Sequence, residues 1–248
     1  MDMTFLLITT IGVACLLGGL LKGISGSGLP SVVVPLVALQ SDVPTAVAIA
    51  QIPTLAINLA QAWPRAHPAR SVLPHWPIAA TLFVATLIGV SLLRMTPPTI
   101  LLLIVAGLTT FAAMFLVLVP SFVLPKRLRL TVGVPIASVA GVSAGLASLA
   151  GPILVPYLLS LRLPKDLFIS VVSLCYLACI VPTIGAFLYW NVVDPRLFIL
   201  SGVAVLPALL GMWVGNRMRD RIDERRFRYV VLTVLVGTAA LLVGKALS

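Results

Sequence analysis

The sequence predicts an all-α polytopic membrane protein built from two inverted repeats of about five segments each, and three observations support this fold class. The chain has 248 residues, 60% of them hydrophobic and only 10% charged, whereas a soluble domain carries about 25% charged residues. Several apolar runs reach the ~20 residues that a helix needs to cross a bilayer. Two Gly-rich, Pro-containing segments, 19–30 and 141–152, match with one shift of 122 positions.

The predicted elements follow the same order in an N-terminal repeat over residues 1–125 and a C-terminal repeat over residues 126–248, which together form one membrane domain. In the first repeat we expect long spans and, after the Gly-rich break, one short piece: 4–21, then the short 30–39, then 44–63, 76–93 and 99–119. The second repeat gives 130–147, the short 152–161, 167–190, 197–215 and 229–247. An odd number of segments per repeat implies inversion. A helix of about ten residues is only ~15 Å long, so each short piece must begin or end inside the protein.

Charged residues lie almost entirely between the apolar runs and predict the topology. Basic clusters occur near Arg65, Lys126 and Arg217, and the positive-inside rule places such loops on the cytoplasmic side. This predicts a multi-pass protein of the cytoplasmic (inner) membrane with both chain termini outside. Because a topology signal explains the basic patches, we expect the lipid bilayer and not a nucleic acid as partner. A homo-oligomer stays open.

The two breaks supply the first candidate site. A helix that begins inside the membrane exposes free backbone N–H groups and a partial positive charge, which attract anions. Pro30 and Pro152 suit the first turn of such a helix because proline has no N–H group to leave unpaired. We expect one anion cradle at Ser25, Gly26, Ser27 and Gly28, and a second over residues 148–151 that includes Ser148 and Gly151. Helix packing is the alternative, because the GxxxG spacing is present in two pairs, Gly19 with Gly23 and Gly141 with Gly145.

A polar helix face predicts a second part of the same site. Its residues follow helical spacing: Gln51, Thr54, Asn58 and Gln61. The shift of 122 maps them onto four further positions, three of them polar: Ser173, Tyr176, Ile180 and Thr183. Polar side chains are costly in lipid, so this face is expected to line a transport pathway, with interhelical hydrogen bonding as the alternative. Lys22, just before the first break, is either a charge partner for an anion or a side chain that snorkels to the cytoplasmic interface.

Other chemistries find little support in the residues. No Asp or Glu occupies a predicted span interior, which favours an anionic or neutral substrate over a cation. The histidines and cysteines form no metal-ligand or CxxC pattern, so we expect neither a metal nor a cofactor. An intramembrane enzyme would need a nucleophile–base pair or buried carboxylates, and neither is visible, so we expect no enzyme.

Both halves share a further pattern. The Gly-rich segments 26–28 and 147–151 each lead to a Val-Pro step, Val34-Pro35 and Val155-Pro156, and then to a polar-faced helix. This pattern, over most of the chain, resembles the sulfite exporter TauE/SafE family, also called the TSUP transporters. Members often carry consecutive glycines before the Val-Pro step, whereas this chain has Leu29-Pro30 and Ala150-Gly151. The resemblance implies transport of sulfur-containing anions such as sulfite, thiosulfate or organosulfonates.

Together these features predict a secondary transporter that moves a small sulfur-containing anion across the cytoplasmic membrane by alternating access. The anion would be held between the two broken segments. A passive anion channel and a transporter of a non-sulfur organic anion stay open as alternatives. With Lys22 as a charge partner, the expected substrate-binding residues are Ser25, Gly26, Ser27, Gly28, Gln51, Asn58, Ser148, Gly151, Ser173 and Tyr176.

Overall fold

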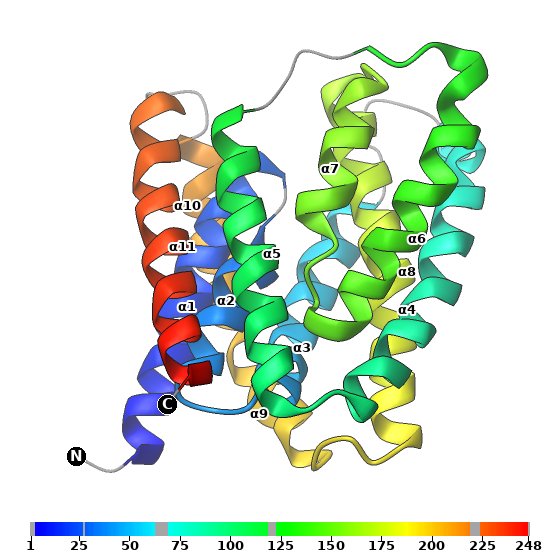
Figure 1. Ribbon diagram of the computed structural model, residues 1–248. Coiled ribbons are helices and arrows are strands. Elements are labelled where there is room, and N and C mark those ends of the chain that lie inside the picture. The colour runs from blue at the N-terminus through cyan, green and yellow to red at the C-terminus, as the bar shows by residue number, and fades with distance from the viewer. Residues whose placement is uncertain (1–2, 27, 63–68, 119–122, 219–223, 248) are drawn as a thin grey trace.

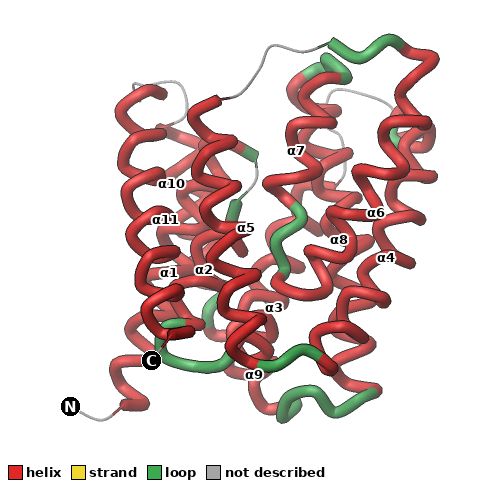
Figure 2. Tube along the Cα trace, viewed as in Figure 1, coloured by secondary structure: helices red, strands yellow, loops and turns green. Residues whose placement is uncertain are grey.

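A computed structural model describes residues 3–26, 28–62, 69–118, 123–218 and 224–247. The fold is all-helical, with 87% helix and no strand in the described ranges, as Figures 1 and 2 show. The first half contains α1 (Met3–Ser25), α2 (Leu29–Ala38), α3 (Val43–Ala62), α4 (Trp76–Met95) and α5 (Pro98–Leu118). The second contains α6 (Arg129–Ala147), α7 (Gly151–Ser160), α8 (Lys165–Tyr189), α9 (Arg196–Val203), α10 (Val205–Met218) and α11 (Glu224–Leu247).

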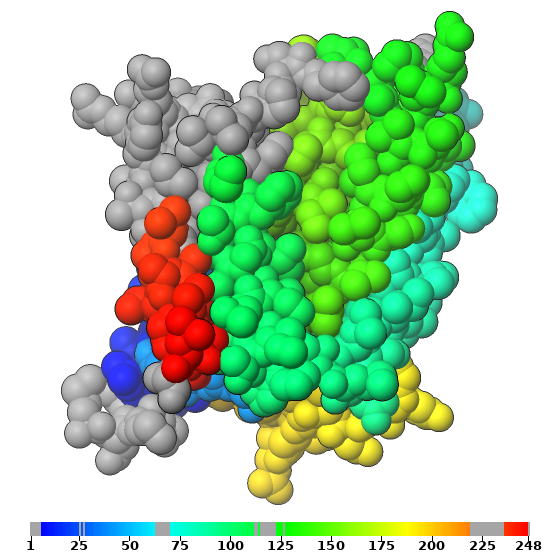
Figure 3. Space-filling model, in the orientation of Figure 1, coloured from blue at the N-terminus to red at the C-terminus, as the bar shows by residue number. Residues whose placement is uncertain are grey.

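The helices have the length and surface of a membrane protein. In the described part of the chain, six helical segments are long and apolar enough to cross a bilayer. Large apolar side chains are exposed along the outer faces of α4, α5, α6 and α10, where a soluble protein would carry charges. Figure 3 shows the outer surfaces of α5 and α6 on one such face, with α7 between them. Examples are Val84, Ile88, Leu103, Val134 and Leu210.

The element order recurs with the shift of 122 residues that the sequence indicates. The bounds of α2 and α7 correspond residue for residue, and α3 and α8 begin at corresponding positions. Helix pairing is exchanged between the halves: α1 packs along α10, and its counterpart α6 packs along α4. The expected pieces are therefore present, with boundaries within a few residues of those predicted. Inversion of the two halves relative to the membrane stays a prediction.

The GxxxG glycines bring these helix backbones together. A Cβ atom at Gly19 would collide with the carbonyl oxygen of Ala208, and one at Gly23 would lie 2.5 Å from that of Met212. In the other half, a Cβ at Gly145 would collide with the carbonyl oxygen of Thr86. The packing alternative therefore holds for these glycines, which lie in the interfaces of α1 with α10 and of α6 with α4.

The predicted span over 197–215 is present as one apolar segment, Arg196–Met218, long enough to cross a bilayer, but it is interrupted at Ala204 between α9 and α10. Pro207 explains the division: it has no N–H group to donate to the carbonyl of Val203, and its ring clashes with that carbonyl. The N–H group of Ala208 still donates to Ala204 at 3.3 Å, which restarts the helix.

Ser201 on α9 replaces a backbone hydrogen bond that a second proline removes from α3. Because Pro53 has no N–H group, the carbonyl of Ile49 loses its helical partner. The Ser201 hydroxyl donates to that carbonyl at 2.5 Å and accepts the N–H of Ile52 at 3.3 Å. This contact keeps the polar face of α3 helical across the proline, and nothing in the sequence pattern indicated it.

Candidate functional site

The two breaks have the same backbone geometry where α1 and α6 end. Gly26 and Ser148, related by the shift of 122, both have positive φ values, 80° and 58°. The N–H of Gly26 donates to the carbonyl of Lys22 at 2.8 Å, and that of Ser148 donates to Ala144 at 2.7 Å. Each helix thus ends in a left-handed residue that turns the chain back into the bundle. These two N–H groups are used in the turns, so they do not contribute to the expected anion cradles.

The short helices begin inside the protein, as expected. Pro30 and Pro152 lie in the first turns of α2 and α7. In α7, the N–H groups of Ile153 and Leu154 both donate to the carbonyl of Ala150, at 3.2 and 2.9 Å. Nine of the ten residues of α2 are buried. The two helices then run to opposite ends of the bundle in Figure 1. At one end, Lys245 donates to the carbonyl of Ala38 at 2.8 Å; at the other, the carbonyl of Ser160 accepts the N–H of Leu124 at 3.0 Å.

Lys22 is the centre of a buried cluster of polar and aromatic side chains close to the first break. Its side chain is 1% exposed, and its Nζ donates to Asn58 Oδ1 at 2.8 Å. The same Nζ lies 4.8 Å from the ring centroid of Tyr176, within cation–π distance. The Asn58 amide nitrogen donates to the carbonyl of Thr54 at 2.7 Å, which fixes Oδ1 toward the lysine. The snorkelling alternative for Lys22 is wrong, because its ammonium lies inside the bundle.

Helix register places Ser173 one turn before Tyr176, the ring that faces Lys22, on α8. Helices α3 and α8 run antiparallel, and the Ser170 hydroxyl donates to the carbonyl of Gln61 at 3.3 Å. Asn58 lies three residues before Gln61 on α3, and Ser173 lies three residues after Ser170 on α8. Because the helices are antiparallel, both steps are a shift of ~4.5 Å in the same direction. The hydroxyl of Ser173 is completely buried and has no hydrogen-bond partner in the described part of the chain. We call Lys22, Asn58, Ser173 and Tyr176 the lysine cluster.

Gln51 and Ser148 form a second contact, which we call the glutamine cluster. Gln51 Nε2 donates to the Ser148 hydroxyl and to the carbonyl of Val47, both at 3.2 Å. The Val47 carbonyl fixes the amide orientation, because a flipped amide would place two oxygens together. Gln51 is 1% exposed, and its Oε1 accepts no hydrogen bond among the described residues. A buried acceptor in this state is available to a ligand or a water molecule.

The structure therefore brings together some of the expected site residues and separates others. Asn58 and Gln51 lie two helical turns apart on α3, so they belong to different ends of the candidate site. Gly28 precedes α2 with a φ of 110°, Gly151 begins α7 and Ser25 ends α1. Ser27 lies outside the described residues. Interhelical hydrogen bonding, the alternative for the polar face, also occurs, since both clusters join α3 to other helices.

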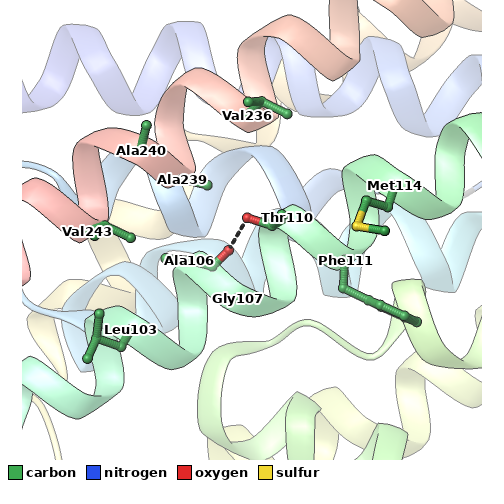
Figure 4. A pocket seen from close by; sticks show the side chains of 10 residues that line it. All are labelled: Leu103, Ala106, Gly107, Thr110, Phe111, Met114, Val236, Ala239, Ala240 and Val243. Carbon is green, nitrogen blue, oxygen red and sulfur yellow. Dashed lines mark hydrogen bonds between the residues drawn. The ribbon is translucent and has the colours of Figure 1, made fainter.

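Two surface cavities lie outside these clusters. One, of about 540 Å³, includes Asp42, Arg94, Trp190 and Lys245 at the end of the bundle where α2 ends. The other is an open, apolar groove of about 620 Å³ between α5 and α11 (Figure 4). The only polar contact drawn there is that of the Thr110 hydroxyl with the Ala106 carbonyl, at 2.9 Å. Neither cavity contains a cluster residue, and no described group of three His, Cys, Asp or Glu could hold a metal.

Comparison with known proteins identifies the family. The family model described as sulfite exporter TauE/SafE matches residues 11–242, which include both breaks and both clusters. No curated protein and no solved structure matches the chain. The family consists of membrane transporters of sulfur anions such as sulfite, and not of enzymes. With a match over almost its whole length, the chain belongs to the sulfite exporter TauE/SafE family.

Proposed function

We propose that the protein is a secondary transporter that moves a small sulfur-containing anion, such as sulfite, thiosulfate or an organosulfonate, across the cytoplasmic membrane. The observation that carries the proposal is a buried lysine without a buried carboxylate partner among the described residues. Lys22 Nζ contacts an amide oxygen and an aromatic ring, and neither neutralises a full charge. A buried ammonium is costly unless it is paired, and a bound anion supplies the missing charge.

The anion would be held between the two broken segments. In the lysine cluster, Lys22 and the free hydroxyl of Ser173 donate hydrogen bonds to its oxygens. In the glutamine cluster, Gln51 and Ser148 extend the polar lining of the site toward the start of α7 without adding a charge. The first turns of α2 and α7, near Gly28 and Gly151, add backbone dipoles that favour negative charge.

Alternating access would open this site to each side in turn. Gln51, Asn58 and Ser173 are each at most 1% exposed, so the anion reaches them only if helices move. The recurring element order and the exchanged pairing of α1 with α10 and α6 with α4 support two inverted repeats that rock against each other. A permanently open channel would instead expose its polar lining to water.

The proposed orientation places the basic loops in the cytoplasm. The connection from α5 to α6, near Lys126, and the end of α10, at Arg217, lie at one end of the bundle in Figure 1. The start of α1 and the end of α11 lie at the other end. This arrangement supports the positive-inside prediction. Arg65, the third basic position, lies outside the described residues.

The test is counterflow of ³⁵S-sulfite in proteoliposomes loaded with unlabelled sulfite, with protein-free liposomes as control. We expect transient, saturable accumulation of label that a sulfonate reduces and a carboxylate does not. Conductance without saturable exchange would identify a channel. No exchange of any sulfur anion by folded, inserted protein would overturn the proposal.

A further inference from the structure

The candidate site offers fewer positive charges than a divalent sulfur anion carries negative charges. Lys22 is the one charged side chain that is buried in the described part of the chain. The other buried polar residues are neutral amides and hydroxyls, including Gln51, Asn58 and Ser173. The lysine cluster thus provides at most one positive charge, and the glutamine cluster provides none.

The helices packed around Lys22 bring no second charge to it. Helices α2 and α3 contain no ionisable residue. The buried ionisable residues of α8 are Tyr176 and two cysteines, whereas Lys165 and Asp166 lie in its first turn. Arg217, the ionisable residue of α10, lies over the exposed ring of Trp213, 4.2 Å from its centroid.

A singly charged anion matches this arrangement, and a doubly charged one does not. One ammonium neutralises one negative charge, and a second charge taken from water into the bundle stays uncompensated, which disfavours binding. The glutamine cluster contains no charged group that could compensate a second negative charge. Its Gln51 Oε1 can only accept hydrogen bonds, so it favours the O–H group of hydrogen sulfite over the oxygens of sulfonates and divalent anions alike.

We propose that the protein selects singly charged sulfur oxyanions, namely hydrogen sulfite and organosulfonates, over the divalent anions sulfate, thiosulfate and fully deprotonated sulfite. The selection comes from the single charge of Lys22 and the neutral glutamine cluster. This inference rests on the proposed function, because it assumes that the anion binds at these clusters.

Methanesulfonate and sulfate form a suitable probe pair, because they are nearly equal in size and differ in charge. Isothermal titration calorimetry of the purified full-length protein gives the dissociation constant of each anion at fixed ionic strength. We expect methanesulfonate to bind at least about tenfold more tightly than sulfate, a modest fraction of the cost of an unpaired buried charge. Equal binding, tighter binding of sulfate, or no binding of either anion would overturn the inference.

Two variants connect the selection to the residues. Lys22→Met should remove detectable methanesulfonate binding, because no positive charge is then left to pair with the anion; unchanged methanesulfonate affinity would contradict the assignment to Lys22. The double variant Ala144→Lys with Ile180→Asn recreates the lysine and its amide partner at the positions shifted by 122. If it folds, it should bind sulfate more tightly than the wild-type protein does, and unchanged sulfate affinity would contradict the charge-counting argument.

Sulfite counterflow distinguishes failure of the transport proposal from failure of this inference. Selective binding without transport would refute only the transport proposal, whereas transport without charge selection would refute only this inference.

Discussion

The two halves of the molecule use the same backbone break but carry different chemistry beside it. Gly26 and Ser148 end their helices with the same left-handed turn, yet the residue four positions earlier is Lys22 in one half and Ala144 in the other. Asn58, which accepts the lysine hydrogen bond, corresponds to Ile180. The repeat therefore provides the scaffold twice and the buried charge once. A transporter can thus keep a repeated architecture while a single half determines which charge it accepts.

The largest expected effect comes from removing the buried charge. Lys22→Met should lower sulfite counterflow about a hundredfold, because hydrogen bonds to charged groups contribute up to ~3 kcal/mol and each ~1.4 kcal/mol is a factor of ten. The apolar side chain fits a buried position, so we expect thermal stability to be retained. Lys165→Met, an exposed lysine on α8, is the control and should transport normally. Wild-type counterflow by Lys22→Met would show that the difference between the halves has no role in transport.

Asn58→Asp should have the next largest effect, because it gives Lys22 a carboxylate of its own. An internal ion pair would compete with the substrate for the ammonium, and we expect counterflow to fall about 30-fold, in line with the cost of altering a buried charge pair. The comparison variant is Asn216→Asp, the same chemical change at an exposed position on α10. Undiminished counterflow in Asn58→Asp would mean that the substrate does not use the lysine as its counter-charge.

Gln51→Leu tests the neutral glutamine cluster and should have a smaller effect. It removes the amide that joins α3 to Ser148 without removing a charge, and we expect about a tenfold loss in kcat/KM, the effect of one buried hydrogen-bonding group. The fold should persist, which thermal unfolding would check. Gln40→Leu, at an exposed glutamine before α3, is the matched control. Normal transport by Gln51→Leu would remove this residue from the pathway.

The smallest effect is expected when one break is given the sequence of the other. Gly26→Ser should fold, because a Cβ at Gly26 would meet its nearest neighbour, Phe168, at an ordinary 3.8 Å, and Ser148 already adopts the equivalent conformation. The cost of positive φ is about 1–2 kcal/mol, measurable as lower thermal stability with counterflow reduced less than about threefold. The reciprocal Ser148→Gly should gain backbone stability and lose the hydroxyl that Gln51 contacts. Failure of Gly26→Ser to fold would show that the two breaks are not interchangeable.

The fold was largely readable from the sequence, because long apolar runs and prolines at helix starts determine most helix bounds. The division at Ala204 was not, since one proline can kink, break or be tolerated in a helix, depending on its surroundings. For the site, helical spacing identified Gln51 and Asn58 correctly as one polar face. It could not assign their partners: the contacts of Asn58 with Lys22, and of Gln51 with Ser148, join residues 36 and 97 positions apart. Likewise, the role of Ser201 in repairing α3 depends on a contact between distant helices.

The central claim, that a sulfur anion binds beside Lys22, is tested most directly by locating a heavy-atom substrate analogue. Selenite has the shape of sulfite, and the anomalous signal of selenium in a crystal of the protein would place it without ambiguity. We predict one strong site with a selenite oxygen about 3 Å from Lys22 Nζ and within reach of Ser173. Selenium found only in the cavity beside Arg94 and Lys245, with the lysine cluster empty, would contradict this account.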